Sequence, residues 1–197
     1  MRNLCQALLD SGLTGMTRRR LVVLDRDGTL IVEHQYLSDV QQVELLPGAA
    51  SGLRQLQERG LGLIVITNQS GVGRGFFDLA RLDQIHRRLH ELLHAEGVHL
   101  DGIYVCPHTP DDDCRCRKPN TALLELAAKD MGCDLQASFV IGDKACDIAL
   151  GRRVRATTLL VRTGYGAQVA PERTITPDHV VDDLWEAAQV IRRQLVE

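Results

Sequence analysis

The chain has 197 residues, the usual size of one domain, and its hydrophobic fraction of 44% and charged fraction of 25% are those of an ordinary globular protein. This composition excludes disorder, collagen and coiled coil as descriptions of most of the chain. The net charge of -3 argues against a general nucleic-acid binder, and no apolar run approaches the roughly 18 residues that a transmembrane helix needs. We therefore expect neither a nucleic acid nor a membrane as a partner.

Residues 1–17 have the features of a leader outside the core fold. Their short apolar patch is interrupted by Asp10 and Gly12, and the basic run 18–20 follows the patch instead of preceding it. This order is wrong for a secretory signal peptide. Met16 is an alternative start, and we expect residues 18–197 to form a single domain.

Short apolar runs alternate with amphipathic segments along the rest of the chain. The runs predict buried strands that end at Asp25 or span 61–68, 101–106, 138–143 and 157–164. The segments between them predict helices over 47–59, 78–96, 121–131, 145–153 and 182–195. This alternation predicts an α/β fold with an open parallel sheet flanked by helices. In such a sheet, ligands bind at the carboxyl ends of the strands.

Two carboxylates, Asp25 and Asp27, follow the first predicted strand in the motif LDRDGTL. Their spacing predicts that both side chains project to the same side. One carboxylate is able to attack phosphorus and form an aspartyl-phosphate, while a second can protonate the leaving oxygen and then activate water. Because two carboxylates repel phosphate, a hard cation such as Mg²⁺ has to lie between them and the substrate. An ordinary Asp-Gly turn is the alternative.

The second predicted strand ends with Thr67 and Asn68, whose neutral donors suit phosphate oxygens. The loop that follows is rich in glycine and carries Arg74, which is able to reach an anion. A glycine-rich loop after a strand is common, so this motif alone is weak.

The fourth predicted strand ends in the motif VIGDKACD. Asp143 can complete a Mg²⁺ site, Asp147 can orient it from the first turn of the next helix, and Lys144 can assist phosphate binding. A plain helix N-cap is the alternative for Asp143. Cys146 lies where a helix dipole lowers the pKa of a thiol, and a buried inert thiol is the alternative there.

A cluster of potential metal ligands follows the third predicted strand, in the loop 106–118. Cys106, His108, Cys114 and Cys116 supply a complete Cys₃His set for tetrahedral Zn²⁺. Because this set leaves no open position, the zinc would be structural. A disulfide or a chance grouping is the alternative, but clustered cysteines without a signal peptide favour metal binding in a reducing compartment, and we expect the cytoplasm.

Two basic residues, Arg117 and Lys118, follow this loop directly. We expect the zinc loop to hold them near the strand ends. Lys118 would act as a point charge for the transferring phosphoryl group, and Arg117 as a fork for another anionic or polar group. A solvated surface position is the alternative for both.

His86, His90 and His94 repeat on one stripe of the predicted helix over 78–96. Two histidines four residues apart on a helix can bind a metal, but no third ligand lies nearby in the sequence. We therefore predict a solvated helix face.

These features, taken in order, resemble the haloacid dehalogenase-like (HAD-like) phosphohydrolase superfamily, from about Arg20 to Leu195. The resemblance rests on an Asp-x-Asp strand end, a Thr strand end, a lysine and a GD-x-x-x-D strand end. The zinc loop narrows it to the histidinol-phosphatase and heptose-bisphosphate-phosphatase group, through DRDGT, TNQSG, CPH, C-x-CRKP and GDK. The longer run TNQSGVGRG is more similar to the heptose branch.

The resemblance implies a Rossmann-like sheet without a large cap, forming one phosphatase domain. It implies Asp25 as the nucleophile, Asp27 as the general acid/base, and Thr67 and Lys118 as groups that stabilise the phosphoryl group. Mg²⁺ would be held by Asp25, Asp143 and the backbone carbonyl of Asp27, and zinc by the four loop residues. The substrate-binding set would comprise Glu33, His34, Gln35, Tyr36, Asn68, Gln69, Ser70, Arg74, Arg117 and Lys144.

We expect a Mg²⁺-dependent phosphatase whose partner is a small phosphorylated sugar, and we expect a monomer. The leading hypothesis is removal of the 7-phosphate of a heptose 1,7-bisphosphate, because Arg74, Arg117 and Lys144 supply more positive charge than one phosphoryl group requires. A phosphatase for histidinol phosphate or another small phosphomonoester is the alternative. A zinc-stabilised binding domain on the same scaffold is a third hypothesis, which the complete set of catalytic residue types weighs against.

Overall fold

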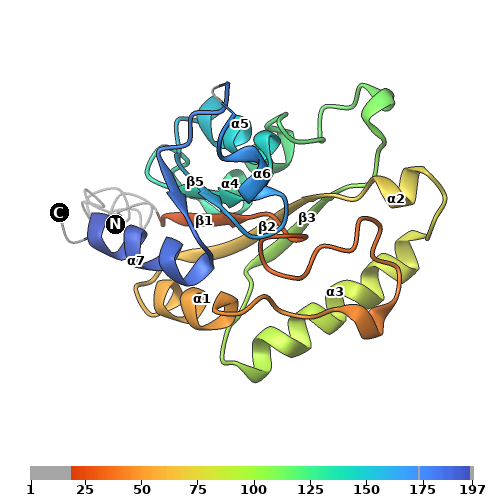
Figure 1. Ribbon diagram of the computed structural model, residues 1–197, viewed down its shortest axis with the longest axis horizontal. Helices are drawn as coiled ribbons and strands as arrows, with labels where there is room; N and C mark the ends of the chain where they lie inside the picture. Colours follow the sequence, from red (N-terminus) through yellow and green to blue (C-terminus); the bar gives the residue numbers. More distant parts are fainter. Residues whose placement is uncertain (1–18, 173, 196–197) are drawn as a thin grey trace, which may run out of the picture.

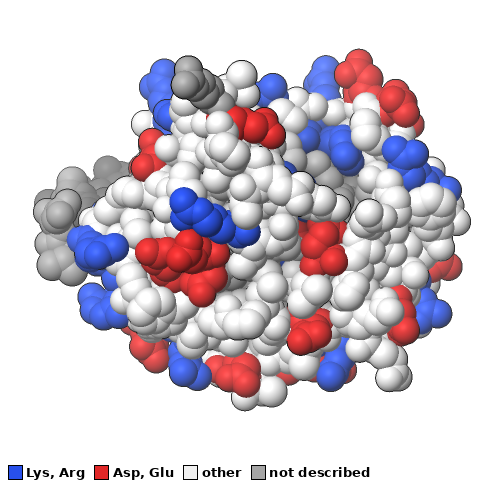
Figure 2. Space-filling model, in the orientation of Figure 1, with Lys and Arg blue, Asp and Glu red and all other residues white. Residues whose placement is uncertain are grey.

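The computed structural model describes residues 19–172 and 174–195. The predicted leader over 1–17 and the alternative start at Met16 lie outside these residues. None of the described helices has the length and apolar character needed to cross a bilayer. Figure 2 shows acidic and basic side chains interspersed over the described part of one face, without a large patch of either sign.

A parallel sheet of six strands forms the centre of the molecule (Figure 1). Its order is β3-β2-β1-β4-β5-β6, with the bounds β1 Leu21–Leu24, β2 Gly62–Asn68, β3 Gly102–Cys106, β4 Phe139–Gly142, β5 Thr157–Val161 and β6 His179–Val181. The five predicted strands are confirmed. The sequence analysis missed β6 because this edge strand has three residues, of which only Val181 is buried.

The five predicted helices are also confirmed, as α1 Ala49–Gln57, α3 Leu79–Ala95, α4 Ala122–Met131, α5 Ala145–Arg153 and α7 Leu184–Gln194. The shorter elements are α2 Ser70–Gly73, α6 Gly166–Val169 and two 3₁₀ turns, Val40–Gln42 and Pro110–Asp112. In Figure 1, α1, α3 and α7 lie on one side of the sheet, and α4 and α5 on the other. The strands are therefore covered on both faces.

Burial on both faces explains why the strands are continuous apolar runs. Val22 and Leu24 of β1 belong to a core cluster that includes Leu53 of α1. Leu21 and Val23, which point the other way, belong to a second cluster that includes Leu124 of α4. Alternate residues of one strand thus supply two separate core layers.

The strand order places the functional edge of the sheet. β1 pairs with β2 on one side and with β4 on the other, so the chain reverses its direction of winding between β1 and β4. Ligands bind outside the carboxyl ends of the strands at such a switch point. Asp25 follows β1 and Asp143 follows β4, so both residues lie at this point.

Three loops, and no large cap domain among the described residues, cover this edge of the sheet. They span residues 25–48, 69–78 and 107–121, and the longest regular element in them is α2, with four residues. The first loop begins with a tight turn, in which the backbone N–H groups of Thr29, Leu30 and Ile31 donate to the carbonyl of Arg26. This turn fixes the chain immediately after Asp25.

Close packing of α1 against α7 requires the glycine at position 52. A Cβ built there would lie 2.6 Å from the carbonyl oxygen of Leu184. We expect Gly52→Ala to lower the free energy of unfolding by about 1–3 kcal/mol, because the two backbones must separate. Glu58→Ala, an exposed change at the end of the same helix, should alter it by less than about 0.5 kcal/mol. Urea denaturation measures both, and an unchanged midpoint for Gly52→Ala would contradict this account of the packing.

Candidate active site

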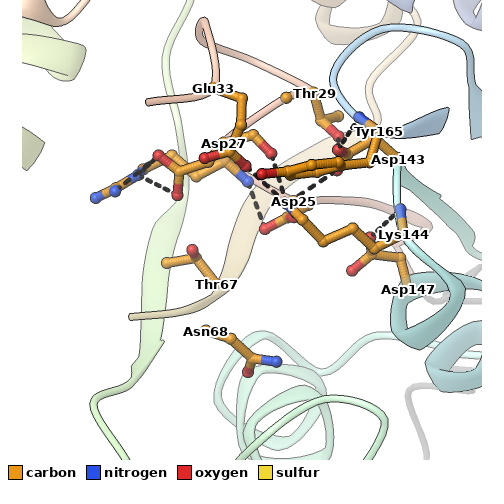
Figure 3. Close-up of polar contacts among 12 residues, drawn as sticks. Asp25, Asp27, Thr29, Glu33, Thr67, Asn68, Asp143, Lys144, Asp147 and Tyr165 are labelled. Carbon is orange, nitrogen blue, oxygen red and sulfur yellow. Dashed lines mark hydrogen bonds and ion pairs between the residues drawn. The ribbon is translucent and has the colours of Figure 1, made fainter. Parts of the chain in front are cut away.

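Three buried carboxylates meet at the switch point of the sheet (Figure 3). Asp25 comes from the end of β1, Asp143 from the end of β4 and Asp147 from the first turn of α5. Oxygens of the three side chains lie within 4.8 Å of one another. Because carboxylates this close repel one another when they are ionised, the arrangement requires cations.

Lys118 supplies the first cation. Its buried Nζ lies 2.8 Å from Oδ1 of Asp25 and 2.7 Å from Oδ1 of Asp147. Burial by itself would raise the pKa of Asp25, but the ammonium groups of Lys118 and Lys144 outweigh it and lower that pKa. Asp25 is therefore an ionised carboxylate in a largely dry environment.

Lys144 supplies the second cation. Its Nζ lies 3.6 Å from Oδ2 of Asp25, 3.4 Å from Oδ1 of Asp143, 3.2 Å from the backbone carbonyl of Asp27 and 3.0 Å from Oε2 of Glu33. Oxygen ligands from carboxylates and a carbonyl are those that Mg²⁺ prefers. The first three groups are the Mg²⁺ ligands implied by the family resemblance, and the ammonium position demonstrates that they face a common point. These residues fit a magnesium ion.

The charge state of Asp143 also points to a further cation. Burial, and then the charge of Asp25, raise the pKa of Asp143 to about 7. A divalent ion would lower it again and keep the carboxylate ionised.

The loop after β5 fixes Asp143, a contribution that the sequence analysis missed. The backbone N–H of Tyr165 donates to Oδ2 of Asp143 at 2.9 Å, and the hydroxyl of Thr163 donates to the carbonyl of Gly28 at 2.6 Å. A Cβ on either Gly28 or Gly164 would lie 2.3 Å from Oδ2 of Asp143, so both positions require glycine. The run TGYG directly after the fifth strand was the available signal.

Asp27 has different partners from Asp25. The guanidinium of Arg26 donates to both of its carboxylate oxygens, at 2.9 Å from Nη2 and 3.1 Å from Nε. Gln69 donates from Nε2 to Asp27 at 2.7 Å and to the hydroxyl of Thr67 at 2.7 Å. Arg26 is completely buried, and the sequence analysis gave it no role. The position of Arg26 between Asp25 and Asp27 was the sequence signal that could have pointed to this role.

His86 of α3 lies behind this network. Its Nε2 is 3.0 Å from Nη1 of Arg26. The prediction of a solvated helix face is therefore wrong for His86, which is partly buried, whereas His90 and His94 are exposed. The buried side of α3 extends as far as the guanidinium of Arg26. The spacing of apolar residues along a helix does not reveal a polar neighbour of this kind.

The carboxyl end of β2 holds the backbone at Lys118. Oδ1 of Asn68 accepts from the backbone N–H of Lys118 at 2.9 Å, and Nδ2 of Asn68 donates to its carbonyl at 3.2 Å. Thr67 is buried beside Gln69, Ser70 begins α2, and Arg74 is exposed at the end of α2. Asn68 and Gln69 therefore use their side chains on neighbouring protein groups, and their predicted contacts with substrate stay predictions.

The segment from Glu33 to Tyr36 links the carboxylate site to the loop after α2. Glu33 reaches Lys144, His34 and Gln35 are exposed, and the ring of Tyr36 packs edge-on to Phe76 with centroids 4.7 Å apart. The predicted role of this segment in substrate binding also remains a prediction.

The four potential zinc ligands come together in the loop after β3. The ligand atoms of Cys106, His108, Cys114 and Cys116 lie within 4.8 Å of one another, and the closest pairs are 3.2–3.7 Å apart. A tetrahedron with metal–sulfur distances of about 2.3 Å has edges near these lengths. All described cysteines are free, so a disulfide within the cluster is excluded. The residues fit a zinc ion.

Protonation of the cluster agrees with this interpretation. Burial and the neighbouring Cys116 thiol raise the pKa of Cys106. Although desolvation acts to raise it, hydrogen bonds from Cys116 and Cys106 lower the pKa of Cys114 to about 7. Burial also raises the pKa of Cys116, so a bound metal cation would be needed to hold all three residues as thiolates.

The prediction of an acidic thiol at Cys146 is wrong. Burial and the charge of Asp147 raise its pKa to about 12. The helix dipole is weaker than these two effects, and the alternative of an inert thiol agrees with the structure.

Comparisons with known proteins agree with this fold. The family model described as HAD-hydrolase-like matches residues 115–187. D-glycero-β-D-manno-heptose-1,7-bisphosphate 7-phosphatase from Pasteurella multocida is 38% identical over 74% of this chain and 83% of its own length. The enzyme of the same name from Escherichia coli K12 is 36% identical over 88% of this chain and 94% of its own length.

Solved structures also show similarity to heptose bisphosphate phosphatases. The crystal structure of D,D-heptose 1,7-bisphosphate phosphatase from B. bronchiseptica, complexed with magnesium and phosphate, has a TM-score of 0.82 and 31% sequence identity. The match covers 89% of this chain and 99% of that one. The chain therefore belongs to the D-glycero-β-D-manno-heptose-1,7-bisphosphate 7-phosphatase family of HAD-like hydrolases.

Proposed function

We propose that this protein removes the 7-phosphate of D-glycero-β-D-manno-heptose 1,7-bisphosphate, with Asp25 as the nucleophile. The observation that carries the proposal is the ionised, buried carboxylate of Asp25 between the ammonium groups of Lys118 and Lys144. The substrate comes from the names of relatives that match most of the chain.

The contacts of the two carboxylate oxygens of Asp25 differ, and they support its proposed role as the nucleophile. Oδ1 accepts from the backbone N–H of Arg26 at 2.7 Å and lies 2.8 Å from Nζ of Lys118. Oδ2 has only the longer contact with Lys144, at 3.6 Å. One oxygen of this carboxylate forms the bond to phosphorus while the bond from phosphorus to the sugar oxygen breaks, and Asp25 becomes an aspartyl-phosphate.

Asp27 then serves as the general acid/base. In its protonated form it gives its proton to the departing sugar oxygen, and the resulting carboxylate then takes a proton from the water that hydrolyses the aspartyl-phosphate. The hydroxyl of Thr67, at the end of β2, and Lys118, which reaches Asp25 from the loop after β3, stabilise charge on the phosphoryl oxygens.

Two metal ions complete the proposal. Asp25, Asp143 and the carbonyl of Asp27 would hold Mg²⁺, which when bound offsets the repulsion between the carboxylates and an incoming phosphate. Cys106, His108, Cys114 and Cys116 would hold a structural Zn²⁺ that fixes the loop leading to Arg117 and Lys118. Free thiols in this cluster suit a reducing compartment, which supports the expectation of a cytoplasmic enzyme.

The basic side chains around the site favour a bisphosphate. Lys118 forms ion pairs with Asp25 and Asp147, whereas Arg74 is exposed and Arg117 is only partly buried. Nη1 of Arg117 donates to the carbonyl of His108, so this side chain lies along the cysteine-histidine loop. Guanidinium groups at the rim of the site suit a second phosphate that is not transferred.

Phosphate release from a panel of substrates tests the assignment. With Mg²⁺, we expect kcat/KM to be at least about tenfold higher for the heptose 1,7-bisphosphate than for histidinol phosphate, because the rim arginines repel a protonated amine. The product should keep its 1-phosphate, which NMR of the product identifies. Equal or reversed preference would reject the proposed substrate while leaving phosphatase activity in place.

Asp25→Asn tests covalent catalysis. An amide has nearly the same shape as the carboxylate but is a very poor nucleophile, so we expect kcat to fall by more than about a thousandfold. The variant should remain folded and still bind inorganic phosphate, as thermal unfolding and calorimetry would establish. Asp83→Asn, at an exposed position on α3, is the matched control with full activity. Substantial residual turnover by Asp25→Asn would exclude the aspartyl-phosphate.

Cys116→Ser tests the structural zinc. Metal analysis should find one zinc per wild-type chain and little in the variant, which should be less stable and less active because the loop before Lys118 loses its anchor. Cys133→Ser changes a buried cysteine outside the cluster and should retain its zinc. Zinc-free wild-type protein with Cys114 in a disulfide would disprove the ligand assignment.

A further inference from the structure

A buried polar network lies behind Asp27 and ends at His86. At its centre is Arg26, whose side chain has no exposed surface. The guanidinium donates to the Asp27 carboxylate on one side, to Oε1 of Gln69 at 2.9 Å on a second, and faces Nε2 of His86 at 3.0 Å on a third. None of the steps described above uses His86.

The chemistry of Arg26 determines the state of His86. A guanidinium carries only N–H donors, so Nε2 of His86 must be the acceptor and the ring must be neutral, with its proton on Nδ1. Burial, and then the positive charge of Arg26, lower the pKa of His86 to about 4. Asp27 and Asp83 act in the opposite direction and His90 adds to the lowering, but the ring stays neutral near pH 7.

This contact has a consequence for Asp27. Nη2 of Arg26 is shared between Asp27 and Gln69, and Nη1 has His86 as its partner. Removing the acceptor would leave a buried N–H group unpaired, which the guanidinium can relieve only by rotating away from its present plane. Because the guanidinium fork holds both oxygens of Asp27, such a rotation would move the carboxylate as well.

We propose that His86 is a positioning residue, which acts through Arg26 to hold the carboxylate of Asp27 where it can protonate the leaving oxygen. The role of Asp27 rests on the proposed function. Small displacements of a proton donor reduce its effect strongly, so His86 should matter for substrates that need a proton on departure.

Leaving-group dependence separates positioning from a structural role. The sugar oxygen of a heptose 7-phosphate must be protonated as it leaves, whereas p-nitrophenolate is a stable anion that leaves without a proton. Since kcat/KM reports the steps up to formation of the aspartyl-phosphate, it isolates this difference. We would therefore compare kcat/KM for the heptose 1,7-bisphosphate and p-nitrophenyl phosphate, with Mg²⁺ present.

Three variants provide the comparison. His86→Leu removes the acceptor, and we expect kcat/KM to fall at least about tenfold for the heptose ester but less than about threefold for p-nitrophenyl phosphate. His86→Gln keeps an acceptor oxygen and should recover most of the loss. His90→Leu changes an exposed histidine one turn later on α3 and should affect neither substrate. Thermal unfolding and binding of inorganic phosphate would establish that each variant is folded.

Several outcomes would overturn the proposal. Equal losses on both esters by folded His86→Leu would mean a general structural role, and no loss on either would mean that Asp27 does not depend on this contact. A ¹⁵N NMR spectrum of the wild-type ring with the proton on Nε2 would exclude the acceptor role. If the wild-type enzyme hydrolyses another alkyl phosphate but not the heptose ester, the proposed substrate fails, and the ratio measured with that alkyl ester decides the role of His86.

Discussion

The site depends on neutralising carboxylates that the fold buries at the end of β1. Lys118 lies between Asp25 and Asp147, at 2.8 and 2.7 Å, and all three side chains are almost inaccessible to solvent. Removing one partner of such a pair leaves an uncompensated buried charge, at a cost of about 3–5 kcal/mol. The interaction that keeps Asp25 ionised consequently also holds together the end of β1, the segment after the cysteine-histidine loop and the start of α5.

This requirement explains the loop after β3. Lys118 has to reach a buried position from a segment that is largely polar and exposed, with no core of its own. Four potential zinc ligands lie within 4.8 Å of one another and begin at Cys106, the last residue of β3, and the proposed zinc would take the place of the missing core. Asn68, the last residue of β2, holds the other end of the loop by bonding the backbone of Lys118. Two neighbouring strand ends therefore fix the loop at both of its ends.

Sequence patterns predict the fold well because burial on both faces makes each inner strand a continuous apolar run. The same reasoning locates Asp25, Thr67 and Asp143, since carboxyl ends of parallel strands share one edge of the sheet. This reasoning fails where a strand is very short or where a contact is made by a backbone group. The edge strand β6 has three residues, and the contact with Asp143 comes from the backbone N–H of Tyr165, for which the glycines on either side are the only sequence signal.

His86 illustrates a second limit. Its position on α3 adjoins the buried Ile85, at the border of the apolar stripe. Periodicity distinguishes an inner from an outer face, but it does not reveal that a completely buried guanidinium lies beside that border. The partner, Arg26, lies 60 positions earlier in the chain, and only the folded structure brings the two side chains together.

The two carboxylates of the first motif have different surroundings, although they lie in the same turn. Asp25 faces two ammonium groups, which are point charges on flexible stems and can exchange a carboxylate oxygen for a phosphate oxygen. Asp27 faces a planar guanidinium and a carboxamide, whose fixed geometry favours a defined orientation over exchange. A nucleophile must part from its partners as it attacks, whereas a proton donor must keep its direction. The difference between their partners therefore matches the roles proposed for Asp25 and Asp27, two residues apart in the sequence.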